Sequence, residues 1–209
     1  KTYANLDSLQ RNRSFRRTLK LGYLLAQSYV NAGPVEFGPM EYTYSFNDLE
    51  GSRIRLSGRT TRQFSEKLYA EAYTAYGFRD DRVKFFGGVA HTLNGRRVGE
   101  YPSHYLQATY QRDVREPGQL LGFRNGDSFA RSFRSGVQDK WSYYEVFKLN
   151  HVVEFGNHVL LQTFIASQRQ APAAKLHFIT AGANADTLRA LQTSELGVDL
   201  RWAPNEEFF

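Results

Sequence analysis

The chain has 209 residues, a net charge of +6, no cysteine and an aromatic content of 15%. This length allows one large all-β domain or two small ones, and the lack of cysteine excludes a disulfide scaffold and a thiolate metal site. The mean hydropathy of −0.54 and the lack of any run of about 20 apolar residues exclude a helical membrane protein. They do not exclude a membrane β-barrel, because half of each barrel strand faces a polar lumen.

The N-terminal segment, residues 1–33, differs in pattern from the rest of the chain. We expect a short helix in its first half and a strand from Leu19, with one continuous helix as the alternative. Its basic cluster, from Arg11 to Lys20, is either a solvated face or an anchor for anionic lipid headgroups. Because Lys1 to Asp7 lack the apolar core of a signal peptide, the chain is either cytoplasmic or a mature or internal piece of a longer protein.

Residues 40–93 show apolar and polar side chains in alternation, which predicts strands with two different faces. We expect strands over residues 40–46, 53–59, 67–79 and 83–92, separated by short turns. In the second of these, Ile54 and Leu56 alternate with Arg53 and Arg55. The apolar face therefore meets either a protein core or lipid.

The second half of the chain predicts longer strands and two long connections. Strands are expected over residues 103–112, 141–155, 158–168 and 193–202, and the connections cover residues 113–140 and 171–192. Several of these strands reach the 9–11 residues or so that a tilted membrane strand needs, whereas strands of globular proteins most often have about 5–6. Strand length therefore favours lipid over a protein core.

Four segments carry a resemblance to a known family: GPVEFGPMEYTYSFNDLEGSRIRLSGRTT, YTAYGFRDDRVKFFGGVAHTLN, GEYPSHYLQATYQRDVREPGQ and SELGVDLRWAPNE. They resemble bacterial outer-membrane proteins of unknown function that carry a carboxypeptidase-regulatory-like domain before a β-barrel. The barrel is distantly similar to surface-antigen and outer-membrane assembly barrels. The resemblance implies that residues 34–209 are a barrel segment, truncated at its C-terminus and without the regulatory-like domain. It also implies a location in the bacterial outer membrane.

The expected fold is an all-β antiparallel transmembrane barrel, or a segment of one, without catalytic activity. Charged side chains predicted to face the lumen are Arg53, Arg55, Arg59, Lys67, Glu71, Arg79, Asp199 and Arg201. Apolar side chains predicted to face lipid are Ile54, Leu56, Leu68, Tyr76, Leu106, Tyr110, Leu196, Val198 and Leu200. The expected partners are the lipid bilayer with its lipopolysaccharide and an envelope protein of unknown identity. The role would be in transport, secretion or surface assembly.

Other functions have weaker support in the sequence. Gly126-Asp127-Ser128-Phe129 is similar to the nucleophile block of a lipase and esterase family, but the late Asp-x-x-His motif of that family is missing. His151 and His158 flank a predicted hairpin, and two histidines without a third ligand make a weak metal site. We therefore expect no cofactor, no metal and no nucleic-acid partner. A soluble all-β domain that binds a ligand or partner is the alternative, and an enzyme on a β scaffold is the third class.

Overall fold

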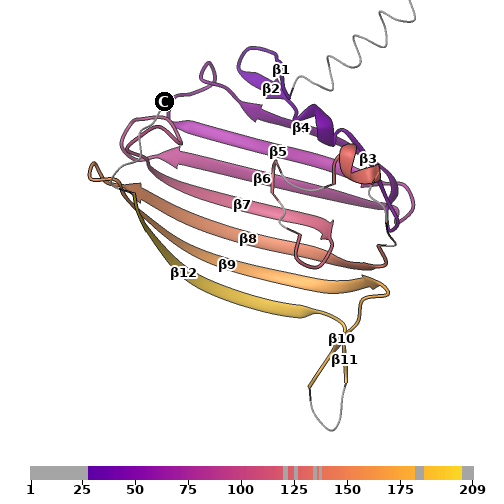
Figure 1. The fold of residues 1–209 in the computed structure, drawn as a ribbon. Helices are drawn as coiled ribbons and strands as arrows, with labels where there is room; N and C mark the ends of the chain where they lie inside the picture. Colours follow the sequence, from indigo (N-terminus) through magenta and orange to yellow (C-terminus); the bar gives the residue numbers. More distant parts are fainter. Residues whose placement is uncertain are drawn as a thin grey trace, which may run out of the picture.

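The computed structural model describes residues 28–119, 122–124, 127–133, 136, 138–181 and 186–203. These residues form one large antiparallel sheet with the strand order β1-β2-β4-β5-β6-β7-β8-β9-β12, with β3 paired to β4 (Figure 1). The first strands are β1 (Val30–Asn31), β2 (Val35–Phe37), β3 (Tyr44–Asn47), β4 (Gly51–Thr60), β5 (Leu68–Gly77) and β6 (Arg82–Thr92). The later strands are β7 (His104–Arg115), β8 (Lys140–Glu154), β9 (Val159–Ala174) and β12 (Leu191–Trp202).

Three small elements lie outside this succession of long strands. Two are 3-10 helices, η1 (Met40–Tyr42) and η2 (Ala130–Phe133), and the third is a hairpin of β10 (Phe178–Ile179) with β11 (Thr187–Leu188). Because β4 to β9 follow one another in sequence and pair with their neighbours, this part of the sheet is a simple meander. All its pairings are antiparallel, so short connections suffice between the strands.

The prediction of an all-β antiparallel fold is confirmed. Within the described residues, β1 and β12 end the strand order and do not pair with each other, so the sheet is curved but open (Figure 1). The helix is predicted in the first half of residues 1–33, and residues 1–27 lie outside the described part of the chain. The described end of that segment contains β1, which pairs with β2 through Val30↔Phe37 and Asn31↔Glu36.

Three predicted strand bounds are wrong. The predicted connection 171–192 is too long, because β9 continues to Ala174 in pairing with β8 and β12 begins at Leu191. Met40–Tyr42 form η1 instead of starting a strand, because the amides of Tyr42 and Thr43 bond back to the carbonyls of Pro39 and Met40. The sequence predicts Asp113 in a long connection, but β7 continues to Arg115 and pairs with β8 along its whole length. A charged residue at a strand end is easily mistaken for the start of a loop, and only the strand pairing corrects this.

The described residues of the connection between β7 and β8 (residues 116–139) include segments that lie over one face of the sheet (Figure 1). Its described residues bond to the N-terminal strands: the Phe129 amide donates to the Glu41 carbonyl at 2.9 Å, and the Phe46 amide donates to Ser132 Oγ at 2.8 Å. Phe123 is buried and packs against Phe86 of β6 in a tilted arrangement, with ring centroids 6.0 Å apart. This connection therefore covers the charged side chains described next.

Candidate functional site

The two faces of the sheet have opposite chemistry. The polar face carries Arg53, Tyr73, Lys84, Gln111 and Asn150, all of which are buried. The apolar face is exposed and carries large hydrophobic side chains. They include Leu56, Val89, Leu149, Ile165 and Val198. This distribution is the reverse of a soluble globular domain, in which apolar side chains are buried and charged ones face water.

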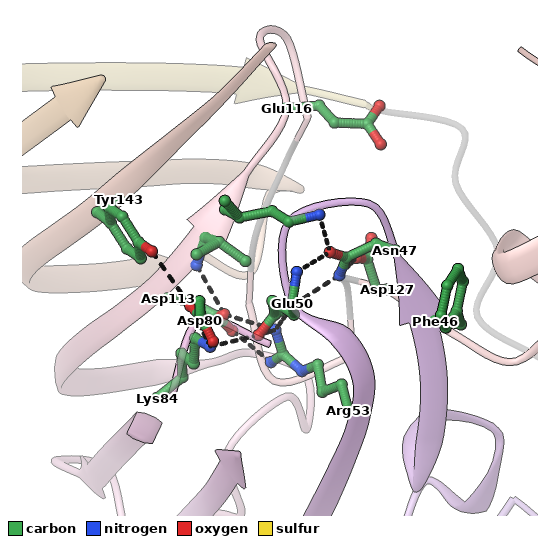
Figure 2. Close-up of polar contacts among 12 residues, drawn as sticks. Phe46, Asn47, Glu50, Arg53, Asp80, Lys84, Asp113, Glu116, Asp127 and Tyr143 are labelled. Carbon is green, nitrogen blue, oxygen red and sulfur yellow. Dashed lines mark hydrogen bonds and ion pairs between the residues drawn. The ribbon is translucent and has the colours of Figure 1, made fainter. Parts of the chain in front are cut away.

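An ionic network lies on the polar face, at the end of the sheet that contains the start of β4 and the end of β7 (Figure 2). Its centre is Arg53, which is only 4% exposed. The Arg53 guanidinium donates to both carboxylate oxygens of Asp113, at 2.7 and 2.8 Å, and to Glu50 Oε2 at 3.0 Å. Two parallel bonds to one carboxylate form the strong fork geometry of arginine, so β4 and β7 are tied together across two intervening strands.

Lys84 of β6 is the second cation of the network and is also buried. Its ammonium lies 2.7 Å from Glu50 Oε1 and 2.7 Å from Asp80 Oδ1. The Tyr143 hydroxyl of β8 donates to Asp80 Oδ2 at 3.2 Å, which brings a fourth strand into contact with the network (Figure 2). Glu50 therefore bridges both cations, and both Arg53 and Lys84 have oppositely charged partners.

The network extends into the connection that covers it. Asn47 donates through Nδ2 to Glu50 Oε2 at 2.7 Å and to Asp127 Oδ2 at 2.8 Å (Figure 2). Gln119 Nε2 donates to Asp127 Oδ1 at 3.3 Å. Burial, with the negative charge of Glu50 nearby, raises the pKa of Asp127 above its ordinary value of 3.8, although the charge of Arg53 opposes this shift. Asp127 thus links residues 116–139 to the network through a carboxyl that is costly to ionise.

Next to this network, Arg55 is held by aromatic rings instead of carboxylates. Its guanidinium lies 3.7 Å from the ring centroid of Tyr73 and 5.1 Å from that of Tyr42. It also donates to the Phe123 carbonyl, while Tyr73 donates its hydroxyl to Asp113. Arg55 therefore stabilises the position of the connection over the sheet through cation–π contact and a charge-assisted hydrogen bond.

The serine and histidines considered for catalysis or metal binding have other partners in the described part of the chain. Ser128 is buried, and its described bonds are to the backbone of its own segment: Oγ accepts from the Arg131 amide at 3.4 Å. Among the described residues, no group of three or more His, Asp or Glu side chains is arranged to hold a metal ion. His151 does not approach His158; its Nε2 lies 3.1 Å from Nε2 of His104, and His158 stacks on Tyr101.

The predicted lumen-facing residues fall into three groups. Arg53, Arg55, Arg59 and Glu71 lie on the polar face of β4 and β5, and the structure adds that Arg59 Nη2 pairs with Glu36 Oε2 at 2.8 Å. Lys67 and Arg79 lie in the connections just before and just after β5, and both are exposed. Asp199 and Arg201 alternate with the apolar residues of β12, so they lie on the same side of the sheet as the network but remain exposed.

All nine predicted lipid-facing residues lie on the apolar face, as shown by strand alternation and pairing. Seven are exposed: Ile54, Leu56, Tyr76, Leu106, Leu196, Val198 and Leu200. Leu68 and Tyr110 are half-buried, and Tyr110 donates its hydroxyl to Glu145 on the neighbouring strand.

The sequence does not predict that five charged residues form one cluster: Glu50, Asp80, Lys84, Asp113 and Asp127. A signal existed for Lys84, because it alternates with Phe85 and Val89 and must lie on the opposite face. Glu50 and Asp80 sit in turns, where charged residues are ordinary, so their sequence positions carry no comparable signal.

Comparison of the chain with protein-family models, curated proteins and solved structures finds no match. No helix in the described part of the chain is long and apolar enough to cross a membrane.

Proposed function

We propose that this chain forms the wall of a β-barrel in the bacterial outer membrane, with the apolar face against lipid and the polar face toward the interior. The role is non-catalytic, in transport, secretion or surface assembly. The single observation that carries this proposal is the reversed distribution of side chains: buried ions on one face and exposed hydrophobic residues on the other. The sequence resemblance to outer-membrane barrels points the same way.

An uninterrupted apolar band crosses most of the sheet on its apolar face. One row of paired residues crosses six strands, from β5 to β12, with no polar side chain. It consists of Ala70, Val89, Ala108, Leu149, Ile165 and Leu196. Contact of such a surface with water is unfavourable, because it offers water no hydrogen-bonding group. Apolar patches of this extent usually mark an interaction with a protein or a membrane.

The apolar band runs obliquely across the strands, and its slope supports a barrel wall. The row of paired residues that starts at Leu56 on β4 reaches Gln192 on β12. The apolar stripe of β12 extends from Leu196 to Trp202. The centre of this stripe therefore lies about seven residues beyond Gln192 along β12, which is about 23 Å at 3.3 Å per residue. Six strand spacings measure about 29 Å, which gives a tilt of about 40°. Strands of membrane barrels tilt by about 35–45°.

Strand lengths agree with this interpretation. The strands β7, β8, β9 and β12 have 12, 15, 16 and 12 residues. A tilted strand needs about 9–11 residues to cross the hydrocarbon layer, and the mode in globular proteins is about 5–6. Each of these strands is therefore long enough to span a bilayer.

A soluble all-β domain that binds a ligand or partner is the second candidate. It is favoured by the open sheet and by a large polar cavity described below. In that case a partner protein would have to cover the apolar face. The two candidates differ in what surrounds that face, so solubility separates them.

The test is to refold the full chain by dilution into plain buffer, into detergent micelles and into lipid vesicles. We expect aggregation in buffer, β-sheet circular dichroism in micelles and vesicles, and a folded form that migrates differently from the boiled form in gel electrophoresis. A monodisperse monomer in buffer, with cooperative unfolding and no detergent, would refute the membrane proposal.

A further inference from the structure

A cavity of about 620 Å³ opens on the polar face, at the opposite end of β4 and β5 from the ionic network. It lies between the β4–β5 connection, the β6–β7 connection and residues 123–124. Four arginines line it: Arg59, Arg62, Arg97 and Arg124. Its volume is within the range of about 300–1,000 Å³ typical of small-molecule sites. We call it the arginine cavity.

These arginines differ from those of the ionic network in having spare charge. Within the described residues, Arg62, Arg97 and Arg124 have no carboxylate partner for their guanidinium groups. Arg59 is the exception, because it pairs with Glu36 at 2.8 Å and lies over the Tyr29 ring at 3.6 Å. Arg124 lies 5.8 Å from the Tyr29 ring centroid and feels the charge of Glu71, but like Arg62 and Arg97 it forms no ion pair with a described carboxylate. The hydrogen-bonding forks of these three guanidinium groups are therefore available to a ligand.

The acidic residues of the cavity do not cancel this charge. Glu71 is half-buried and accepts a hydrogen bond from the Tyr69 hydroxyl at 2.7 Å; the charges of Arg124 and Arg59 act on it without a direct ion pair. Glu100 is exposed and accepts from the Arg97 backbone amide at 3.3 Å. A neighbouring hollow of about 320 Å³ shares Arg62, Arg97 and Glu100 and adds Arg96 and Glu66. Cationic groups therefore outnumber acidic ones around the combined space.

We propose that the arginine cavity binds an organic ligand bearing phosphate groups. Guanidinium forks match the planar arrangement of phosphate oxygens and hold them with two parallel hydrogen bonds. The volume far exceeds one phosphate, so the ligand carries its anionic groups on a larger body, and Tyr69 and Phe123 in the lining offer surfaces for that body. The inference holds whether or not the apolar face meets lipid.

The first experiment measures binding of inorganic pyrophosphate to the folded full chain by isothermal titration calorimetry at low salt. We expect one site, with affinity that falls as salt rises because arginine–phosphate contacts are screened. Arg62→Gln and Arg97→Gln should each weaken binding about tenfold, the usual effect of removing one charge-assisted hydrogen bond. Glu71→Gln should strengthen binding severalfold, because it removes a negative charge from the lining.

Arg189→Gln is the matched control. Arg189 is exposed next to the β10–β11 hairpin, at the other end of the sheet, and its substitution changes the net charge by the same amount. It should leave the affinity unchanged. A second arm replaces pyrophosphate by phosphatidylglycerol in mixed micelles; loss of lipid binding in Arg62→Gln and Arg97→Gln, with no pyrophosphate binding, would support the same chemistry with a lipid headgroup as its source.

The proposal is overturned if neither probe binds, or if Arg189→Gln weakens binding as much as the cavity variants. It is also overturned if Glu71→Gln weakens binding, because the charge of the lining would then not govern the affinity. Circular dichroism of each variant checks that it folds, and the exposed positions of Arg62 and Arg189 make this outcome expected.

Discussion

Substitution of Val198 by arginine tests what surrounds the apolar face. Val198 is 69% exposed and lies in the middle of the apolar stripe of β12, between Leu196 and Leu200. If the stripe spans a bilayer, the arginine sits near its midplane and costs about 2–4 kcal/mol of folding free energy. This corresponds to a loss of about 30-fold to about 700-fold in the ratio of folded to unfolded protein. If the face is in water, an exposed surface substitution changes stability by about 0.5 kcal/mol at most.

The assay is urea titration of the chain folded into phosphatidylcholine vesicles. Tryptophan fluorescence reports the transition, because Trp202 is exposed on the apolar face and Trp141 is buried in β8. Ser194→Arg is the matched control: Ser194 lies on the same face of the same strand, about 13 Å along it and outside the apolar stripe. It should cost about 0–1 kcal/mol, as expected near the membrane interface. Equal stability of Val198→Arg and wild type would show that this face does not contact lipid.

Three further predictions concern the polar face. Asp113→Ala leaves Arg53 without its bidentate partner and should cost about 3–5 kcal/mol in urea titration; a cost under about 1 kcal/mol would show that the network contributes little. Gly77→Ala places a methyl group 2.7 Å from the buried lysine ammonium and should cost about 1–3 kcal/mol, whereas Gly87→Ala, with no atom within 4 Å, should be well tolerated; equal costs would contradict the packing. The raised pKa of Asp127 means that the folded state binds its proton more tightly, so this group stabilises below pH 3.8 and loses that effect as the pH rises through its folded pKa. Asp127→Asn should therefore gain stability relative to wild type as the pH rises from 3.8, and a pH-independent difference would refute this.

The faces of the strands could be predicted from the sequence, and their ionic partners could not. Alternation on β4 separates Arg53 and Arg55 from Ile54 and Leu56 without any knowledge of the neighbouring strands. The partner of Arg53 is Asp113, which lies 60 positions away. Only the register of β4 to β7 brings the two together, and register depends on turn lengths that a single sequence does not determine.

The segment that covers the polar face could not be predicted from the sequence either. The sequence predicts a long connection between β7 and β8, but not that Phe123 and Asp127 fold back over Arg53 and Arg55. Each of these contacts joins a loop residue to a strand more than 60 positions earlier. A local sequence pattern cannot predict such long-range pairs. It does predict the apolar face of β12, where no described segment covers Val198.

The alternation along the strands also determines which surface the chain exposes before it folds. Its hydrophobic side chains are separated by polar ones, so the extended chain never presents the run of about 20 apolar residues that halts a polypeptide in a membrane. Only strand pairing gathers Ala70, Val89 and Ala108 into one continuous apolar surface. The unfolded chain therefore carries no continuous apolar surface, and under the proposed membrane location this would let it remain in water until strand pairing creates that surface.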